Sequence, residues 1–139
     1  MRVQVPRLYF LFIGIGLVLY WACAALHLFP PAYLFKDYDD SVIQAWNWSF
    51  LPLAMLIVAS GWGAVMCEVR GNAGAAARLT LVSLSLTFCA GLQSLAFWTL
   101  RGDFEMSWWA PNLFFMASAA YYLLRPEPTA QSTQITTDG

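Results

Sequence analysis

Four long apolar segments constrain the fold of this chain more than any other feature. They cover residues 8–29, 45–67, 77–100 and 107–124. A helix of about 20 apolar residues can cross the hydrocarbon core of a bilayer. Backbone groups in lipid must be hydrogen-bonded within their own segment, which favours an α-helix for each. The sequence therefore predicts an all-α integral membrane protein, an antiparallel bundle of four transmembrane helices.

The composition excludes a small soluble domain. The 139 residues are 60% hydrophobic and 11% charged, whereas soluble domains carry roughly 25% charged residues. A chain of this length cannot bury so much apolar surface in one water-facing core. The first apolar segment also exceeds the roughly 7–15 residues of a signal-peptide core, so we expect a retained helix.

The distribution of Lys and Arg predicts the orientation. One side of the predicted bundle holds Arg2, Arg7, Arg70, Arg78 and Arg125. The other side holds only Lys36 and Arg101. Both termini are therefore expected on the cytoplasmic side. Residues 1–125 are predicted to form the transmembrane domain. Residues 126–139, rich in Thr, Pro and Gln, are predicted to be a disordered cytoplasmic tail.

Several classes of function lack their sequence signals. There is no basic tract, which argues against a nucleic-acid partner. Cys23, Cys67 and Cys89 lie in apolar segments without a CxxC pair, and His27 is the single histidine. We therefore expect neither a haem nor a metal site, and no cofactor. No acidic residue lies deep in an apolar segment, which argues against a proton-coupled exporter.

Polar residues within the apolar segments gather toward the non-cytoplasmic end. Such residues are costly in lipid and usually face protein or water. They are His27, Asn47, Ser49, Gln93, Ser94 and Asn112. The cytoplasmic halves hold mainly Leu, Val, Ala and Ser. This asymmetry predicts an outward-facing cavity.

Helical spacing indicates which residues share a face. One stripe holds Gly16, Tyr20, Cys23 and His27. A second stripe repeats every seven residues as Asn47, Ala54, Gly61 and Glu68, a seam of small residues suited to close helix packing. Asn47 should therefore point into the bundle. Trp46 and Trp48 lie about 200° apart on a helix, so they must face different neighbours.

Each of these residues also has a purely structural interpretation. Trp46, Trp48, Trp108 and Trp109 fit an aromatic belt at the membrane interface. Asn47, Gln93 and Asn112 fit hydrogen bonds between helices. His27 fits a structural donor. Arg101 with Asp103 or Glu105 fits an ion pair within a loop, and the RGD sequence fits a turn between helices.

Four stretches point to a known family. The stretches LFKDY, AWNWSFLPL, LTFCAGLQSLAFWTLRGDF and WWAPNLF resemble the YvaD-like bacterial membrane proteins, a family of unknown function. The resemblance covers about residues 8–124. It implies a four-helix, multi-pass protein of the bacterial cytoplasmic (inner) membrane and supplies no activity. With the polar residues above, the candidate ligand-binding residues are His27, Asp37, Trp46, Asn47, Trp48, Gln93, Trp98, Arg101, Asp103, Trp108, Trp109 and Asn112.

The preferred function is non-enzymatic binding of a small amphipathic or lipid-like molecule in an outward-facing, Trp-rich pocket. The chain would act as an accessory or sensor subunit, with membrane lipids as its surroundings. One alternative is a membrane enzyme acting on a lipid or isoprenoid, with His27 as the acid/base. Another is a small transporter that works as a homo-oligomer, with a polar path reaching Glu68.

Overall fold

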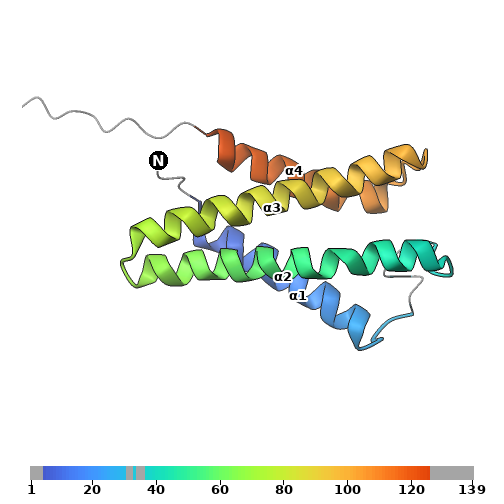
Figure 1. The fold of residues 1–139 in the computed structure, drawn as a ribbon, viewed down its shortest axis with the longest axis horizontal. Coiled ribbons are helices and arrows are strands. Elements are labelled where there is room, and N and C mark those ends of the chain that lie inside the picture. Colours follow the sequence, from blue (N-terminus) through green and yellow to red (C-terminus); the bar gives the residue numbers. More distant parts are fainter. Residues whose placement is uncertain (1–4, 31–32, 34–36, 126–139) are drawn as a thin grey trace, which may run out of the picture.

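A computed structural model describes residues 5–30, 33 and 37–125. It contains helices α1 (Arg7–Ala25), α2 (Ser41–Val69), α3 (Ala73–Leu100) and α4 (Met106–Leu124), with short connections at 70–72 and 101–105 and a longer one at 26–40 (Figure 1). The prediction of an all-α chain with four helices is confirmed. The predicted tail at 126–139 lies outside the described residues.

Helix α1 ends at Ala25 rather than at the predicted residue 29. His27 adopts a left-handed backbone with a φ of 52°. The amide of Leu28 then donates to the carbonyl of Cys23 at 3.1 Å, and the amide of His27 donates to Ala24 at 3.4 Å. This is the Schellman motif, in which a left-handed residue turns the chain back and satisfies the last carbonyls. His27 is therefore in the turn and not on the helical stripe that the spacing predicted.

The same motif ends α2 and α3, with glycine in the left-handed position. Gly71 has a φ of 75° and Gly102 a φ of 69°. The amides that follow, of Asn72 and Asp103, donate to Cys67 and Trp98 at 2.9 and 3.0 Å. Gly102 belongs to the RGD sequence, so the interpretation of that sequence as a turn between helices is confirmed.

A side-chain cap explains why α2 begins before its apolar segment. Asp40 accepts hydrogen bonds from the amides of Val42 and Ile43 at 2.8 and 3.4 Å. A carboxylate at this position satisfies amides that have no partner within the helix. Asn72 caps α3 in the same way, through the amide of Ala75 at 3.1 Å. Both helices thus begin four residues before the predicted positions 45 and 77.

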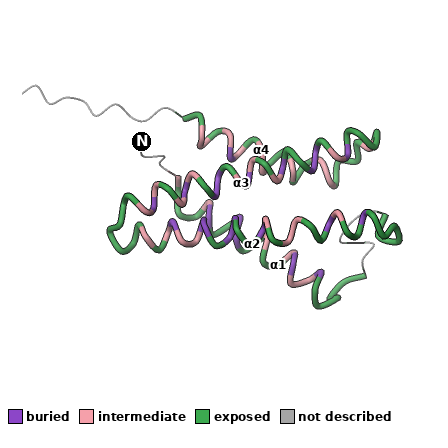
Figure 2. Tube along the Cα trace, viewed as in Figure 1, coloured by how far each residue is buried: buried purple, intermediate pink, exposed green. Residues whose placement is uncertain are grey.

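Helices α2 and α3 lie antiparallel at the centre, with α1 packed on α2 and α4 packed on α3 (Figure 1). Small residues allow the helices to approach closely. A Cβ on Gly61 would lie 3.0 Å from both Phe10 and Ser83. The hydroxyl of Ser83 donates to the carbonyl of Ile57 at 3.1 Å, which joins α3 to α2. Buried residues recur along the facing sides of the helices (Figure 2).

Helices α1, α2 and α3 are long and apolar enough to cross a membrane. Helix α4, which has 19 residues and includes Ser107, Asn112 and Ser118, is not among them. Many large apolar side chains are exposed on all four helices, including Phe12, Leu56, Leu92 and Phe114. Apolar residues on every side of a helix are typical of membrane spans. The four-span prediction is thus supported for three helices.

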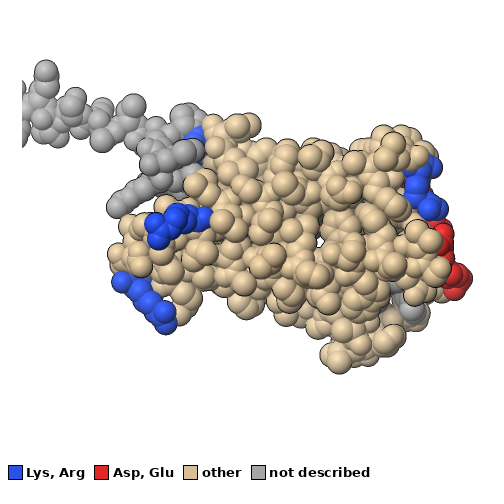
Figure 3. All heavy atoms as spheres, in the orientation of Figure 1, with Lys and Arg blue, Asp and Glu red and all other residues tan. Residues whose placement is uncertain are grey.

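Charged residues mark the two ends of the bundle. The space-filling view shows Lys and Arg at one end, basic and acidic residues at the other, and an uncharged band between them (Figure 3). Arg7 and Glu68 form an ion pair at 3.0 Å at the first end, called the Glu68 end below. Arg101 and Asp37 form one at 3.1 Å at the opposite end, called the Trp46 end because α2 begins there.

Candidate functional site

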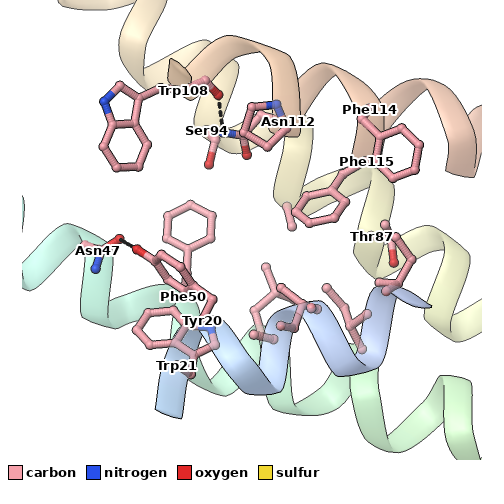
Figure 4. A pocket seen from close by; sticks show the side chains of 18 of the residues that line it. Tyr20, Trp21, Asn47, Phe50, Thr87, Ser94, Trp108, Asn112, Phe114 and Phe115 are labelled. Atoms are coloured by element: carbon pink, nitrogen blue, oxygen red, sulfur yellow. Dashed lines mark hydrogen bonds between the residues drawn. The ribbon is translucent and has the colours of Figure 1, made fainter. Parts of the chain in front are cut away.

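A cavity of about 540 Å³ lies between the helices. All four helices line it: α1 from Phe12 to Trp21, α2 from Ile43 to Ile57, α3 from Thr87 to Trp98 and α4 from Trp108 to Phe115. Its walls are mostly aliphatic and aromatic, and none of the described residues that line it carries a formal charge. Figure 4 shows the α1–α2 wall facing the α3–α4 wall across the open space.

The mouth of the cavity lies between α1 and α4. The lining residues classed as exposed are Phe12 and Gly16 from α1, and Pro111 and Phe114 from α4. These two helices share no extensive interface among the described residues. The sequence predicted a cavity that opens at the non-cytoplasmic end of the bundle. The exposed part of the lining instead lies along the side of the bundle, midway along α1 and α4.

Near the Glu68 end, α1 and α4 do meet. The hydroxyls of Tyr9 and Ser118 are 3.1 Å apart, and the rings of Tyr9 and Tyr122 pack edge to face at 4.9 Å. Closer to the cavity, the ring centroids of Phe12 and Phe114 are 6.2 Å apart. Helices α1 and α4 are thus in contact at Tyr9 and diverge toward the Trp46 end, where the cavity lies between them.

Asn47 is a buried polar residue of the cavity lining. It comes from the small-residue seam of α2 and is 9% exposed. The hydroxyl of Tyr20, on α1, donates to Oδ1 of Asn47 at 3.2 Å (Figure 4). Among the described residues, none accepts a hydrogen bond from Nδ2 of Asn47. The prediction that Asn47 points into the bundle is confirmed.

Other polar side chains of the lining come from α3 and α4. Nδ2 of Asn112 donates to the carbonyl of Trp108 in its own helix at 2.7 Å. The hydroxyl of Thr87 donates to the carbonyl of Ser83 at 2.7 Å. Ser94 is buried and lies across the space from Asn47 and Tyr20 (Figure 4). The polar groups other than Thr87 therefore gather in the half of the cavity nearer the Trp46 end.

Aromatic rings form the wall at this end. Trp46 stacks on Phe97 with centroids 4.0 Å apart, and it meets Trp98 edge to face at 5.7 Å. Trp98 lies nearly parallel to Trp108, with centroids 6.3 Å apart. Trp48 instead packs on Trp21 at 5.4 Å and is partly exposed. Trp46 and Trp48 thus face different neighbours, as their spacing predicts.

The structure brings five of the nominated residues together in the lining: Trp46, Asn47, Trp98, Trp108 and Asn112. Seven others lie outside it: His27, Asp37, Trp48, Gln93, Arg101, Asp103 and Trp109. Gln93 is exposed on α3, while its neighbour Ser94 is buried. Nε1 of Trp109, in the first turn of α4, donates to the carbonyl of Asp103 in the α3–α4 connection at 2.9 Å.

The ion pair expected within one loop joins two connections instead. Arg101 pairs with Asp37 of the α1–α2 connection, whereas the sequence predicted a pair with Asp103 or Glu105. The Arg101 guanidinium also lies 5.9 Å and 6.0 Å from the ring centroids of Phe97 and Trp98. Arg101 therefore lies beside the aromatic wall without lining the cavity.

Sequence reasoning did not nominate several residues that line the cavity, among them Gly16, Tyr20, Trp21, Phe50, Ser94 and Phe115. Tyr20 could have been found, because it shares the predicted stripe with Gly16. Phe50 and Phe115 carry no such signal, since aromatic residues at helical spacing fit any apolar interface.

Glu68 lies outside this cavity. It lines a separate cavity of about 450 Å³ at the Glu68 end, together with Arg125, Thr80 and mainly apolar residues from 5–10, 64–65 and 73–77. Its carboxylate is paired with Arg7. The polar path that the transporter hypothesis requires is therefore not continuous through the described part of a single chain.

Comparison with known proteins identifies the family. Residues 6–127 match the model of a family of unknown function, DUF5360. The chain is 38% identical to the "Uncharacterized protein YvaD" of Bacillus subtilis (strain 168) over 117 residues, which cover 84% of this chain and 87% of that protein. No solved structure matches. The resemblance to YvaD-like proteins is thereby confirmed, and the chain belongs to the DUF5360 family.

Proposed function

We propose that this chain is a multi-pass protein of the bacterial cytoplasmic membrane that binds a small amphipathic or lipid-like molecule in the cavity between α1 and α4. In this proposal both termini are cytoplasmic, and the chain serves as a ligand-binding accessory or sensor subunit. The excess of Arg on the side of the termini supports the orientation. Helix α4 would cross the membrane as well, because it packs along α3.

The mouth of the cavity is the observation that carries the proposal. Its exposed edge consists of Phe12, Gly16, Pro111 and Phe114. These residues lie on two helices whose exposed surfaces are apolar and would face lipid. A ligand could therefore enter from the bilayer without crossing a charged surface. The volume of about 540 Å³ falls within the roughly 300–1,000 Å³ of small-molecule sites.

The part of the cavity between its buried amide and its apolar end is about as deep as one leaflet of a membrane. The α2 lining runs from Ile43 to Ile57, and Asn47 lies about one turn inside it. The ten residues from Asn47 to Ile57 span about 15 Å of helix. This is half of the roughly 30 Å hydrocarbon core. The cavity thus suits a molecule that resides in one leaflet, with its polar part near the Trp46 end and its apolar part toward Ile57.

In this arrangement His27, the acid/base of the enzyme hypothesis, lies outside the cavity. His27 is exposed in the turn after α1 and does not line the cavity. A general acid or base must come within hydrogen-bond reach of the group that it serves. The geometry therefore favours binding over catalysis by His27.

Filling the cavity tests the proposal. A Cβ on Gly16 would meet no atom within 4 Å, so Gly16→Leu can place its side chain in the space. The protein is purified in mild detergent, and native mass spectrometry counts the small molecules that stay bound. We expect wild type to retain a bound molecule and Gly16→Leu to lose it.

Gly74→Leu is the matched control, because Gly74 is also helical, also has open space around it and lies outside the cavity. It should retain the molecule as wild type does. A wild-type protein that carries no bound molecule, or equal retention in Gly16→Leu, would overturn the proposal.

A further inference from the structure

One buried donor in the cavity has no hydrogen-bond partner among the described residues. It is Nδ2 of Asn47, a residue that is only 9% exposed. Burying a polar group without a hydrogen bond is unfavourable, so nearly all such groups in folded proteins have a partner. Because Asn47 lines the open space, a molecule in the cavity can supply the missing acceptor.

The orientation of the amide is set by Tyr20. Its hydroxyl donates to Oδ1 of Asn47 at 3.2 Å, so Oδ1 already accepts a hydrogen bond and Nδ2 is the atom left to bind a ligand. The amide nitrogen of asparagine can donate but cannot accept. Asn47 therefore selects a ligand with an acceptor atom, and Tyr20 is a positioning residue.

The uncharged walls of the cavity favour a ligand without a formal charge. None of the described lining residues carries a formal charge. A carboxylate or an ammonium group would enter this space without a counter-ion, which is strongly unfavourable. A carbonyl oxygen is a neutral acceptor that one amide donor can satisfy. The site is therefore matched to an uncharged head group.

We propose, on the basis of the binding function above, that the ligand is an uncharged lipid whose head carries a carbonyl oxygen, and that this oxygen accepts a hydrogen bond from Nδ2 of Asn47. The hydrocarbon chain extends from there between Phe50 and Phe115 toward Ile57. Both an acyl ester and a long-chain ketone or quinone present this chemistry.

Brominated probes of equal chain length test the head group. Methyl 6,7-dibromohexadecanoate, 6,7-dibromohexadecane and 6,7-dibromohexadecanoate, which carry bromine in the half of the chain near the head group, are titrated into protein in phosphatidylcholine nanodiscs. Bromine quenches tryptophan fluorescence on contact, and four tryptophans line the cavity: Trp21, Trp46, Trp98 and Trp108. We expect the methyl ester to bind about tenfold more tightly than the bromoalkane, the effect of one hydrogen bond in an apolar site. The carboxylate should bind more weakly than the ester.

Asn47→Leu should abolish the preference for the ester while both uncharged probes still bind. Gln93→Leu is the matched control, since it removes the same chemical group from an exposed position outside the cavity. It should keep the tenfold preference. Tyr20→Phe leaves the amide free to rotate, so it should reduce the preference without eliminating binding of the bromoalkane.

The outcomes separate the two proposals. Equal binding of ester and alkane to wild type would overturn the head-group inference and leave the lipid-binding function standing. Tighter binding of the carboxylate would also overturn it. If no probe quenches wild type more than Gly16→Leu, both proposals fail. Should Asn47→Leu not fold, the comparison of probes on wild type still decides. The affinity of a quinone of matched chain length, compared with that of the methyl ester, then shows whether the carbonyl of a quinone or that of an acyl ester is preferred.

Discussion

Gly91 on α3 faces the backbone of Asn112 on α4, and a Cβ on Gly91 would lie 2.6 Å from that carbonyl oxygen and 3.0 Å from the amide nitrogen of Met116. Backbone atoms of a helix cannot move aside as a flexible side chain can. We predict that Gly91→Ala lowers the free energy of unfolding by about 1–2 kcal/mol, the usual range for overpacking less the helix propensity gained.

This change is measured by titrating SDS into mixed micelles and following helicity by circular dichroism. Gly74→Ala provides the comparison, because no atom lies within 4 Å of the Cβ that it adds. It should be neutral or slightly stabilising. Equal stability of the two variants would show that α3 and α4 are not in close contact at Gly91.

The left-handed backbone of His27 predicts an order of stability at this position. Glycine adopts this conformation without cost, whereas a β-branched residue is strained there. We expect His27→Gly to be the most stable, wild type intermediate and His27→Val the least stable, with a spread of about 1–2 kcal/mol. Thermal unfolding in detergent measures the order. A stable His27→Val would contradict the Schellman motif at the end of α1.

The ion pair between Arg101 and Asp37 should contribute little to stability. The two side chains are 40% and 38% exposed, and pairs of this kind are typically worth about 0.2–1 kcal/mol. A double-mutant cycle with Arg101→Gln and Asp37→Asn isolates the pair from the contact of Arg101 with Phe97 and Trp98. Asn also tolerates the left-handed backbone of Asp37, whose φ is 52°. The coupling should shrink as salt is added.

The hydrogen bond between Ser83 and Ile57 should matter more than those within one helix. Ser83 is 2% exposed, and its hydroxyl joins α3 to α2. Ser83→Ala is expected to cost about 0.6–1.7 kcal/mol, as for other hydrogen bonds between membrane helices. Ser60→Ala is the control, because the Ser60 hydroxyl donates to carbonyls of its own helix. Similar losses in both variants would contradict this difference.

The number and order of the helices could be predicted because long apolar segments permit few other structures. Their ends could not be placed from hydropathy, since the ends depend on local hydrogen bonds. Asp40 extends α2 by capping it, and His27 ends α1 by adopting a left-handed backbone. In the sequence, a polar residue that ends or caps a helix looks the same as a polar residue that faces a cavity, so hydropathy does not distinguish them.

The site was predicted only in part, for a geometric reason. Asn47 was placed correctly by its repeat with Ala54 and Gly61. Gln93 and Ser94 are adjacent and both polar, and only the packing of α3 decides that Ser94 is the buried one. The position of the mouth depends on the divergence of α1 from α4, which is a relation between helices at opposite ends of the chain. Periodicity within one helix contains no information about it.

The extensive helix interfaces, α1 with α2, α2 with α3 and α3 with α4, all join helices that are consecutive in the chain. Each new helix can therefore pack on the preceding one as synthesis proceeds, and such local contacts favour fast folding. The contacts of α1 with α4, which are those of Tyr9 with Ser118 and Tyr122 and of Phe12 with Phe114 among the described residues, must wait for the last helix. A chain interrupted after α3 would already hold three of the four cavity walls, so truncation before Met106 should leave three packed helices that have lost the α4 side of the pocket.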